Sequence, residues 1–439
     1  MKKVVKFGGS SLANAEQFQK VGDIIRSDES RRYVVPSAPG KRFDEDIKVT
    51  DMLYGCYDAA SKGEDITEKL NAIKERYYEI IKGLGLSLSL EDEFKKIDED
   101  FRAQAGIQYA ASRGEFLNGK IMAAYLGYEF IDAAEVIVFD ENGNFDGDET
   151  HKILSERLEN TERAVIPGFY GAKPDGSIQT FSRGGSDITG SIVAKAVHAD
   201  MYENWTDVSG FLIADPRIIK NPKPIDVITY RELRELSYMG ATVLHEDAIF
   251  PVRAAGIPVN IKNTNCPQDR GTMIVSETAE PCEHIITGIA GKKGMSVINI
   301  EKDKMNSEVG FGRNVLRALE KSNVSFEHMP SGVDTMSVVI QTDKLAGKET
   351  TILDEIRSRV HPDQLYIESN LALIAVVGRG MKSARGTAAI LFTALADARV
   401  NIKMIDQGSS ELNIIIGVAE EDFEVAMKAI YNAFIKVKK

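Results

Sequence analysis

The 439-residue sequence predicts an α/β protein followed by a C-terminal region of a different kind. Strand and helix patterns alternate through the first ~280 residues, as expected for a sheet covered by helices. Near Pro281 the pattern changes to short strands and two clear helices, and an internal repeat begins. A chain of this length allows about three domains. We therefore expect one domain over residues 1–281 and a second region over residues 282–439.

The predicted elements of the first region follow one another in a regular order. KKVVKF is a short buried strand, GGSSLAN is a turn, and an amphipathic helix covers residues 15–26. RRYVVPSAPG predicts a second strand that ends in a loop rich in proline and glycine. Helical patterns dominate residues 51–126. Further strand patterns are RAVIPGFYG, DMYENWTDVSG, GIPVNIKN and GTMIV.

The C-terminal region contains two copies of one unit. The segment that starts at Met305 aligns without a gap to the segment that starts at Met381. Each copy predicts a strand, a glycine-led helix, a strand, a polar turn and a strand. We interpret the pair as a ligand-sensing regulatory module, and a structural dimerisation module is the alternative. The coinciding pairs are Met305/Met381, Ser307/Ser383, Gly310/Gly386, Ala318/Ala394, Leu319/Leu395 and Val324/Val400.

Composition and charge exclude several classes of function. A formal net charge of −12 argues against a nucleic-acid partner, since phosphate backbones are bound by basic surfaces. No run of about 18 apolar residues predicts a membrane span. The three cysteines form no C-x-x-C pair, so neither a zinc site nor a disulfide framework is indicated, and a reducing cytoplasm is expected. The six histidines show no metal-ligand spacing, and we interpret them as structural.

The first motif that suggests chemistry is KFGGSS, residues 6–11. A strand enters a Gly-Gly turn here, and a helix follows. Glycines let backbone N–H groups approach a phosphate, and a helix N-terminus adds partial positive charge. Lys6 is placed to neutralise the oxygens of a transferring phosphoryl group. An ordinary tight turn is the equally weighted alternative at this stage.

The second motif, SRGGSD, repeats this arrangement at another helix start. The helical pattern begins directly behind Gly184 and Gly185. Arg183 offers a planar fork suited to a carboxylate, and Asp187 falls in the first helical turn, where a negative charge is favoured. Simple N-capping by Ser186 or Asp187 is the alternative. Capping does not explain the Arg-Gly-Gly run, so an anion site is favoured.

Two further stretches of sequence contain candidate site residues. GEFLNGKI, residues 114–121, nearly matches a Walker P-loop but has Ile121 in place of Ser or Thr, and its context is helical. As part of a helix, its Glu115 is free to bind a substrate ammonium group, with a solvated surface carboxylate as the alternative. WTDVSGFLIADPR places Thr206 and Asp207 at the carboxyl end of a strand, where α/β sheets bind ligands. Arg217 follows the Asp215-Pro216 turn and is a candidate phosphate contact.

Three motifs, followed by the tandem repeat, closely resemble those of the aspartate kinases of the amino acid kinase superfamily. In order, they are KFGGSS, SRGGSD and WTDVSGFLIADPR. The likeness spans essentially the whole chain, and the two repeat copies resemble ACT domains. The resemblance implies an amino acid kinase-type open sheet sandwiched by helices, followed by two ferredoxin-like (βαββαβ) ACT units, at about 285–365 and 366–439 and intertwined. It also implies transfer of the γ-phosphoryl group of MgATP to the β-carboxylate of L-aspartate, the first step towards lysine, threonine and methionine. Phosphoryl transfer needs positioning and charge stabilisation rather than a covalent nucleophile, which agrees with two anion sites and one cation at each.

The resemblance assigns site residues position by position. Lys6 and Asp187 are the implied catalytic residues, with magnesium carried by the ATP. The implied ATP-binding residues are Lys6, Gly8, Gly9, Ser10, Thr206, Asp207, Leu212 and Arg217. The implied aspartate-binding residues are Ser37, Thr50, Glu115, Arg183, Gly184 and Ser186.

The sequence also departs from the family pattern. GATVLHED carries Thr242 where family members often have a lysine near the nucleotide, and Glu246 where proline is usual. A cation beside ATP is therefore missing, and a neighbouring Arg or Lys is expected to compensate. The insert GKRFDEDIKV between Ser37 and Thr50 is longer than in many relatives, and the placement of Thr50 depends on it.

For regulation, the resemblance implies feedback inhibition by an end-product amino acid, lysine first and threonine second. Met305, Ser325 and Glu327 match effector contacts, and Glu327 is suited to pair with an effector ammonium group. ACT units usually pair across chains, so a homodimer or homotetramer is expected. From the length, we expect that the linked dehydrogenase domain of some relatives is absent. A kinase with a glutamate or nucleoside monophosphate acceptor, and an amino-acid sensor with an inactive kinase domain, remain as alternatives.

Overall fold

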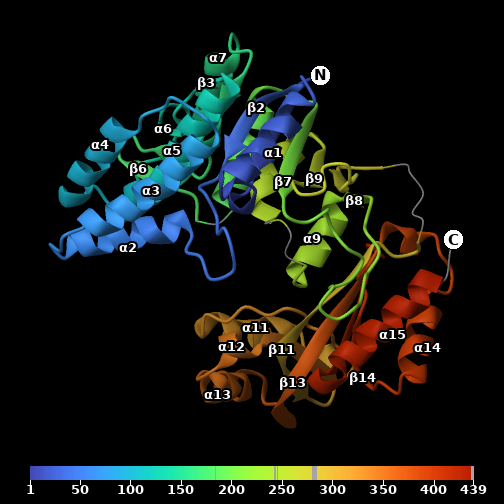
Figure 1. Ribbon diagram of the computed structural model, residues 1–439. Helices are drawn as coiled ribbons and strands as arrows, with labels where there is room; N and C mark the ends of the chain where they lie inside the picture. Colours follow the sequence, from blue (N-terminus) through green and yellow to red (C-terminus); the bar gives the residue numbers. More distant parts are fainter. Residues whose placement is uncertain (183, 242–243, 245, 279–283, 437–439) are drawn as a thin grey trace. The chain divides into compact units, whose positions relative to one another are not determined.

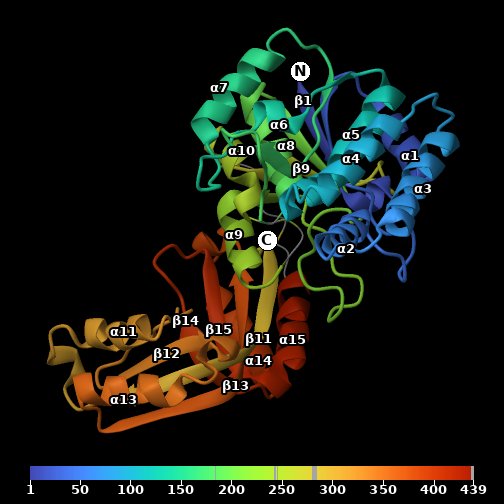
Figure 2. The same ribbon diagram turned by 90° about the vertical axis from the view of Figure 1, so that its left-hand side faces the viewer.

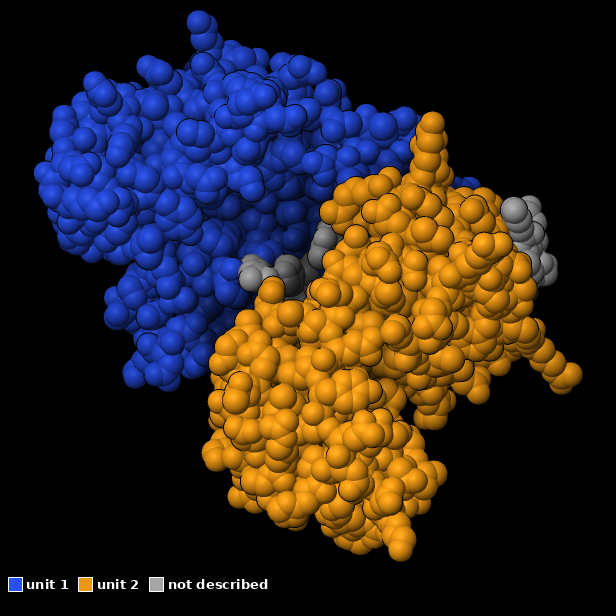
Figure 3. Space-filling view, turned by 90° about the horizontal axis from the view of Figure 1, so that it is seen from below, with its two compact units in different colours: residues 1–211, 224–230, 243–278 blue, residues 212–223, 231–242, 279–439 orange. Residues whose placement is uncertain are grey.

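The chain folds into two compact units. The computed structural model describes residues 1–182, 184–241, 244, 246–278 and 284–436. One unit comprises residues 1–211, 224–230 and 243–278, and the other comprises residues 212–223, 231–242 and 279–439 (Figure 3). We call them the N-terminal unit and the C-terminal unit.

The N-terminal unit is built on an eight-stranded sheet with the order β3-β4-β2-β1-β7-β9-β10-β8. Neighbouring strands run parallel except β9 and β10, which pair antiparallel. A separate two-stranded hairpin, β5-β6, lies beside the sheet. The strands are β1 (Lys3–Phe7), β2 (Arg31–Pro36), β3 (Glu129–Phe130), β4 (Ala164–Val165), β5 (Tyr170–Ala172), β6 (Ile178–Thr180), β7 (Met201–Thr206), β8 (Val227–Thr229), β9 (Val259–Asn263) and β10 (Thr272–Val275).

Helices cover both faces of this sheet, as Figure 2 shows for α1 and α5 on one side of β1 and for α8 and α10 on the other. The predicted helix over residues 15–26 is confirmed: the Asn14 side chain caps it by accepting from the backbone N–H of Gln17. The helices are α1 (Ala15–Arg26), α2 (Val49–Ser61), α3 (Thr67–Gly83), α4 (Glu91–Arg102), α5 (Ile107–Leu126), α6 (Ala133–Val136), α7 (Gly147–Leu158), α8 (Gly185–Ala196) and α10 (Phe250–Ala254).

A continuous hydrophobic core joins the sheet to helices α1 to α5. Val5, Phe7 and Val34 of the sheet are completely buried in it. The near-continuous apolar run of β1 reflects this burial, since a parallel strand covered on both faces has no solvated side. Helix α5 is buried on most of its surface, so its buried residues are not confined to a single stripe.

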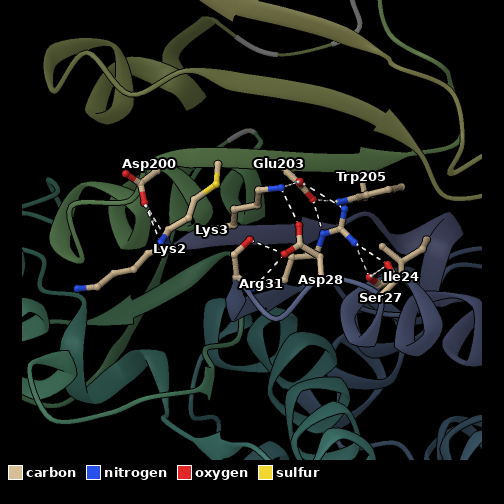
Figure 4. A network of polar contacts seen from close by, with 11 residues as sticks. Lys2, Lys3, Ile24, Ser27, Asp28, Arg31, Asp200, Glu203 and Trp205 are labelled. Atoms are coloured by element: carbon tan, nitrogen blue, oxygen red, sulfur yellow. Dashed lines mark hydrogen bonds and ion pairs between the residues drawn. The ribbon is translucent and has the colours of Figure 1, made fainter.

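A polar network ties β1, β2 and β7 together at the edge of this core (Figure 4). The buried carboxylate of Glu203 accepts from the Arg31 guanidinium at 2.8 Å and from the Trp205 indole at 2.9 Å. Lys3 lies 3.1 Å from Glu203 and 2.8 Å from Asp28. Every buried charge in the network therefore has an opposite charge beside it, as burial in a core requires.

The C-terminal unit contains a five-stranded antiparallel sheet with the order β12-β11-β13-β15-β14. Two long strands, β11 and β13, pair with each other along most of their lengths and serve both halves of the unit (Figure 1). The first half of β11 pairs only with β13, and its second half also pairs with β12. The strands are β11 (Gly288–Glu301), β12 (Thr335–Gln341), β13 (Gln364–Val377), β14 (Ile402–Asp406) and β15 (Asn413–Ala419).

Helices α11 and α13 pack together in one half of this unit, and α14 and α15 pack together in the other. A core around Ile298, Val338 and Ile340 lies under the first pair. The bounds are α11 (Phe311–Lys321), α12 (Thr342–Leu345), α13 (Glu349–Val360), α14 (Thr387–Asp397) and α15 (Phe423–Lys436). Gly310 and Gly386, which lead the two repeat helices, both have positive φ values, 88° and 84°, that side chains rarely adopt.

One predicted strand of the repeat is absent among the described residues. The segment after α11 forms only isolated bridges, His328 to Val339 and Ser331 to Met336. Pro330 lacks the N–H group that a regular ladder needs, which explains the interruption. The equivalent segment of the second copy contains no proline and forms β14.

Helix α9 (Tyr230–Tyr238) lies within the sequence of the predicted first region, but all of its residues except the first belong to the C-terminal unit. Glu232 of α9 is completely buried, and it accepts from Arg379 at 2.9 Å and from Thr287 at 2.5 Å. Glu235 accepts from Asn413 at 2.6 Å. These charged and polar bonds fasten α9 to the β13, β15 end of the C-terminal sheet.

Within the described part of the chain, we find no helix of the length and apolar character that crossing a bilayer would require.

Candidate active site

The two glycine-containing turns meet at the carboxyl ends of the central strands. Lys6, near the end of β1, points its ammonium group at Asp187 in the first turn of α8, with Nζ 2.7 Å from Oδ1. Both side chains are largely buried. Because parallel strands end at one edge of the sheet, this pair marks the place where ligands bind in open α/β sheets.

Asn204 of β7 completes this charged pair. It lies opposite Lys6 in the register of β1 and β7, and its amide donates to Asp187 Oδ1 at 2.8 Å. One carboxylate oxygen therefore receives both an ammonium and an amide hydrogen. This fixes the Asp187 side chain relative to both strands and places the α8 N-terminus beside Lys6.

The N-terminus of α8 is held by close packing. Gly184 caps the helix with φ 57° and ψ 28°, a left-handed conformation that favours glycine. A Cβ on Gly185 would lie 2.5 Å from a ring carbon of Phe169, so this glycine is required by its neighbours. Gly168 likewise makes room for Ser186, whose Oγ would lie 2.6 Å from a Cβ at that position.

Helix α5 brings Glu115 to the site. Only 5 % of Glu115 is exposed, so the alternative of a solvated surface carboxylate is wrong. Its Oε2 atom has no hydrogen-bond partner among the described residues. Burial raises the pKa of Glu115 to about 8, although the backbone N–H of Ala38 donates to the carboxylate and opposes the rise. A buried carboxylate with a vacant oxygen is suited to bind a cationic group.

Ser37 and Thr50 lie next to this part of α5. The Ser37 carbonyl accepts from the Asn118 amide at 2.6 Å, and the Ser37 N–H donates to the Phe7 carbonyl at 3.0 Å. Thr50 is the second residue of α2, and its methyl group would lie 3.6 Å from a Cβ on Gly114. The loop after β2, the start of α2 and the Glu115 region of α5 are thus in contact.

The KFGGSS turn packs against that same loop. A Cβ on Gly9 would approach the Ala38 carbonyl oxygen to 2.9 Å, and the Gly40 N–H donates to the Gly9 carbonyl at 2.8 Å. Gly8 differs, because a Cβ there would make only ordinary contacts, 3.6 Å from Lys6 Nζ. Packing therefore requires glycine at position 9, whereas at position 8 the bare backbone leaves space beside the Lys6 ammonium group. Ser10 is exposed in the short 3-10 helix that follows.

The predicted nucleotide residues are divided between the units. Thr206 ends β7; its carbonyl accepts from the Thr264 N–H, and its hydroxyl donates to Asp207 at 3.2 Å. Leu212 and Arg217 belong to the C-terminal unit. Arg217 is 85 % exposed in its side chain and pairs with Asp215 at 2.6 Å.

Two of the site residues identified from the sequence lie outside the described residues: Arg183, implied to bind the substrate carboxylate, and Thr242, which replaces a lysine of the family. The described members that the structure brings together are Lys6, Gly8, Gly9, Ser37, Thr50, Glu115, Ser186 and Asp187. Sequence reasoning missed Asn118 and Asn204. Asn118 could have been found from its position about one helical turn after Glu115. Asn204 could have been found only from the pairing of β7 with β1, which places it opposite Lys6.

The three predicted effector residues lie in the first half of the C-terminal unit. Glu327 is almost completely buried in its side chain, with Lys292 Nζ at 2.7 Å and Lys344 Nζ at 3.5 Å. Ser325 Oγ accepts from Lys344 at 3.0 Å. Burial raises the pKa of Glu327, but the bonds from Lys292 and Tyr238 and the charges of both lysines outweigh it and lower the pKa below the usual value. Met305 is buried in the core under α11.

The chain is similar to known proteins along most of its length. A model of the amino acid kinase family matches residues 1–263, and an ACT domain model matches residues 374–434. Aspartokinase 3 of Bacillus subtilis is 41% identical over 453 residues, covering 98% of each chain. Aspartokinase 1 of Arabidopsis thaliana is 30% identical and covers 99% of this chain and 80% of its own length.

Solved structures give the same result. Aspartate kinase of Clostridium acetobutylicum is 54% identical, with a TM-score of 0.90 over 99% of this chain and all of its own. Aspartokinase III of Escherichia coli, in complex with aspartate and ADP, is 25% identical with a TM-score of 0.74 and covers the same shares of the two chains. With a family model over residues 1–263 and a relative matching along almost the full length, this chain belongs to the amino acid kinase family and carries a C-terminal ACT region.

Proposed function

We propose that this protein is an aspartate kinase that transfers the γ-phosphoryl group of MgATP to the β-carboxylate of L-aspartate and forms 4-phospho-L-aspartate. The proposal depends on one observation: in the described part of the chain, a site with a paired cation lies next to a site with an unpaired buried carboxylate oxygen. Lys6 and Asp187 lie 2.7 Å apart at the strand ends, and the vacant carboxylate oxygen of Glu115 lies on the adjoining wall. The aspartate and ADP bound to the Escherichia coli relative support the same pair of ligands.

In this proposal the two sides of the site bind different substrates. The turn of Gly8, Gly9 and Ser10 binds the nucleotide phosphates with its backbone N–H groups, and Thr206, Asp207, Leu212 and Arg217 contact the rest of ATP. Glu115 binds the substrate ammonium, and Ser37, Thr50, Arg183, Gly184 and Ser186 bind its polar and carboxylate groups. Magnesium enters with ATP. Among the described residues no cluster of three His, Cys, Asp or Glu side chains forms a metal site of its own.

Lys6 and the α8 N-terminus then supply the electrostatic part of catalysis. Charge that develops on the transferring phosphoryl oxygens is stabilised by the Lys6 ammonium group, which Asp187 and Asn204 hold in position. No general base is needed, because the β-carboxylate is already ionised at neutral pH. The reaction therefore depends on positioning rather than on proton transfer.

A coupled ADP-release assay tests this proposal against its alternatives. The purified protein is given MgATP with L-aspartate, with L-glutamate, with a nucleoside monophosphate and with no acceptor. We expect ADP release with L-aspartate at least tenfold above every other condition. A faster rate with another acceptor would replace aspartate, and release at the background rate under all conditions would leave a non-catalytic amino-acid sensor.

We further propose feedback inhibition by an end-product amino acid at the Glu327 site, with lysine the first choice and threonine the second. The lysine-bound state of the Escherichia coli relative supports this order. Glu327 is already paired with two lysines, so an effector ammonium group must replace one of them. Lys344 is the weaker partner, with a longer distance and a more exposed side chain than Lys292. Self-association through the ACT region, as a dimer or tetramer, belongs to the same proposal.

Inhibition curves with Glu327→Gln test the regulatory site. The amide keeps the shape of the side chain but cannot pair with an ammonium ion. We expect inhibition by lysine to weaken at least tenfold while the uninhibited rate stays within about twofold. Glu355→Gln on α13, whose partners are Lys321 and Arg359, is the matched control. Unchanged inhibition by both lysine and threonine would remove Glu327 from the effector site.

A further inference from the structure

Arg76 is a buried arginine of α3 that joins separate segments of the N-terminal unit. Only 5 % of its surface is exposed. One side of its guanidinium, Nη1, donates to Asp46 Oδ2 at 2.8 Å. The other side, Nη2, donates to the Gly40 carbonyl at 3.0 Å and to the Ala13 carbonyl at 3.4 Å. One planar group therefore holds both ends of the segment 40–46 and the chain directly behind the KFGGSS turn.

The long insert GKRFDEDIKV, residues 40–49, is closed on itself by charged bonds. Asp46 accepts from Arg42 Nε at 2.9 Å and from Arg76 Nη1 at 2.8 Å. The Asp46 side chain is itself largely buried, so these bonds are shielded from solvent. Because Arg76 has this carboxylate as its counter-charge, its bonds to the two carbonyls are not needed to neutralise it. They fix the position of backbone instead.

Gly40 connects Arg76 to the proposed phosphate turn. The Gly40 N–H donates to the Gly9 carbonyl at 2.8 Å. A Cβ on Gly40 would lie 2.6 Å from the carbonyl carbon of Gly9 and 2.8 Å from the backbone nitrogen of Ser10. Since the two backbones are in direct contact, a shift of Gly40 must move the turn. Arg76 thus acts on the turn from two directions, through Gly40 and through Ala13.

We propose that Arg76 is a positioning residue for the nucleotide: its bonds to the Gly40 and Ala13 carbonyls fix the backbone of the KFGGSS turn, which binds the phosphates of ATP. This inference rests on the proposed function, because it assumes a nucleotide at that turn. Arginine suits the role, since its fork donates in two directions at once, whereas a lysine ammonium group is a single point. A turn that is already fixed binds more tightly, because less ordering remains to be done when the ligand arrives.

Two variants of Arg76 and a matched control separate positioning from general stability. Arg76→Lys retains a cation for Asp46 but loses the fork. Arg76→Gln removes the cation altogether and leaves Asp46 paired with Arg42. The control is Arg31→Lys, at a second buried arginine, whose fork bonds Glu203 and a backbone carbonyl. Arg31 lies at the amino end of β2, whereas the site lies at the carboxyl ends of the strands.

Amide hydrogen exchange of the full-length protein, without any ligand, tests the hold of Arg76 on the turn. Circular dichroism first establishes that each variant is folded. We expect the peptides that cover residues 8–13 and 37–46 to exchange about tenfold faster in both Arg76 variants than in wild type. In Arg31→Lys these peptides should exchange at the wild-type rate. Wild-type rates in the Arg76 variants, or an equal acceleration in the control, would overturn the inference.

Calorimetric titration with MgADP and steady-state kinetics test the consequence for the nucleotide. We expect Kd for MgADP and KM for ATP to rise about tenfold in both Arg76 variants, the equivalent of one hydrogen bond from a charged group. KM for aspartate and kcat at saturating ATP should stay within about threefold of wild type. A rise that Arg31→Lys shares, or that affects both substrates equally, would assign Arg76 to stability alone. If exchange changes but the wild-type protein binds no MgADP, the proposed function fails and the hold of Arg76 on the turn stands.

Discussion

At the scale of single residues, Lys6 and Asp187 neutralise each other in a largely buried position, so neither charge is left unpaired before a nucleotide arrives. The geometry of the pair is fixed by Asn204, which donates to the same oxygen of Asp187. Under the proposed function, a phosphate that enters beside Gly8 would meet an ammonium group already in position. Preorganised charge of this kind lowers a barrier without reorganisation at the moment of reaction.

Lys6→Ala should lower kcat at least 100-fold, because the transferring phosphoryl oxygens lose their cation. The fold should persist, since the removed charge leaves Asp187 with the Asn204 amide and access to solvent. The measurements are ADP release with L-aspartate and circular dichroism. Lys20→Ala, at an exposed ion pair with Glu16 on α1, is the control and should retain wild-type turnover. Turnover within a few-fold of wild type would remove Lys6 from the reaction.

The sequence predicted those site residues that stand in unusual contexts. Lys6 and Asp187 flank Gly-Gly runs at helix starts, and Glu115 stands in a near match to a P-loop, so each drew attention. Asn118 and Asn204 did not, because an asparagine inside a helix or a strand is ordinary until its neighbours in space are known. The burial that raises the pKa of Glu115 was equally invisible, since it arises from α2, α3 and the loop after β2.

At the scale of elements, the position of α8 depends on backbone contacts that admit no side chain. Gly185→Ala would place a Cβ 2.5 Å from the Phe169 ring and 2.9 Å from the Phe169 Cα, which is backbone and cannot turn aside. We expect a loss of about 1–3 kcal/mol in the free energy of unfolding and a higher KM for aspartate as α8 shifts.

Gly55→Ala is the matched control for that substitution. Gly55 lies inside α2, and no neighbouring atom comes within 4 Å of the position that a Cβ would occupy there. Alanine should therefore stabilise the helix by about 0.5–1 kcal/mol. Denaturant unfolding measures both variants. If the two glycines respond alike, close packing at the α8 N-terminus is not what requires Gly185.

The polar network around Glu203 provides a stability prediction. Burial alone would raise the pKa of Glu203, but the bond and charge of Arg31, together with Lys3 and Trp205, outweigh it and lower the pKa. A carboxyl with a depressed pKa in the folded state stabilises the protein at neutral pH. That contribution is lost as the pH falls below the usual glutamate value of 4.5.

Glu203→Gln should therefore cost about 3 kcal/mol at pH 7, because Arg31 and Lys3 lose their buried counter-charge. The difference from wild type should narrow as the pH is lowered towards 3. Urea unfolding at several pH values provides the measurement, and Glu16→Gln at an exposed position should change stability by less than about 0.5 kcal/mol. A difference that does not depend on pH would mean that the Glu203 charge contributes nothing.

Element prediction succeeded where one local rule sufficed. The helix over residues 15–26 was predicted with the observed bounds from its apolar spacing alone, and in the structure the Asn14 side chain caps its start. The strand expected after α11 failed because Pro330 interrupts the ladder, although the second copy of the repeat forms it. Similarity between the two copies indicated that they share one unit. It could not indicate that the missing N–H group of Pro330 would prevent one strand of the first copy from forming.

At the scale of the whole molecule, the chain passes repeatedly between the two units, and α9 belongs almost entirely to the C-terminal one. The long strands β11 and β13 each serve both repeat copies. Sequence alignment of the copies could not predict this sharing, because strand pairing is set by contacts far apart in the chain. Helix α9 reaches the predicted effector site within the same unit, since the Tyr238 hydroxyl bonds to Glu327 and its ring lies 4.4 Å from Lys292 Nζ.

Tyr238→Phe tests whether α9 senses the effector site. Phenylalanine retains the ring contact with Lys292 and removes only the bond to Glu327. We expect the lysine concentration for half-inhibition to change about three- to tenfold, the equivalent of one hydrogen bond to a charged group, with the uninhibited kcat unchanged. Tyr366→Phe, at an exposed tyrosine of β13, is the control. Identical inhibition curves for Tyr238→Phe and wild type would exclude this bond from the coupling.

The proposal that Lys6, α8 and Glu115 form one site for ATP and aspartate is tested most directly by trapping the product. The protein is incubated with MgATP, L-aspartate and hydroxylamine, which converts an acyl phosphate into a hydroxamate, and the hydroxamate is identified by mass spectrometry against both isomers. We predict β-aspartyl hydroxamate in an amount equal to the ADP released, and neither product with Lys6→Ala. The α-isomer, or ADP release without any hydroxamate, would contradict the account.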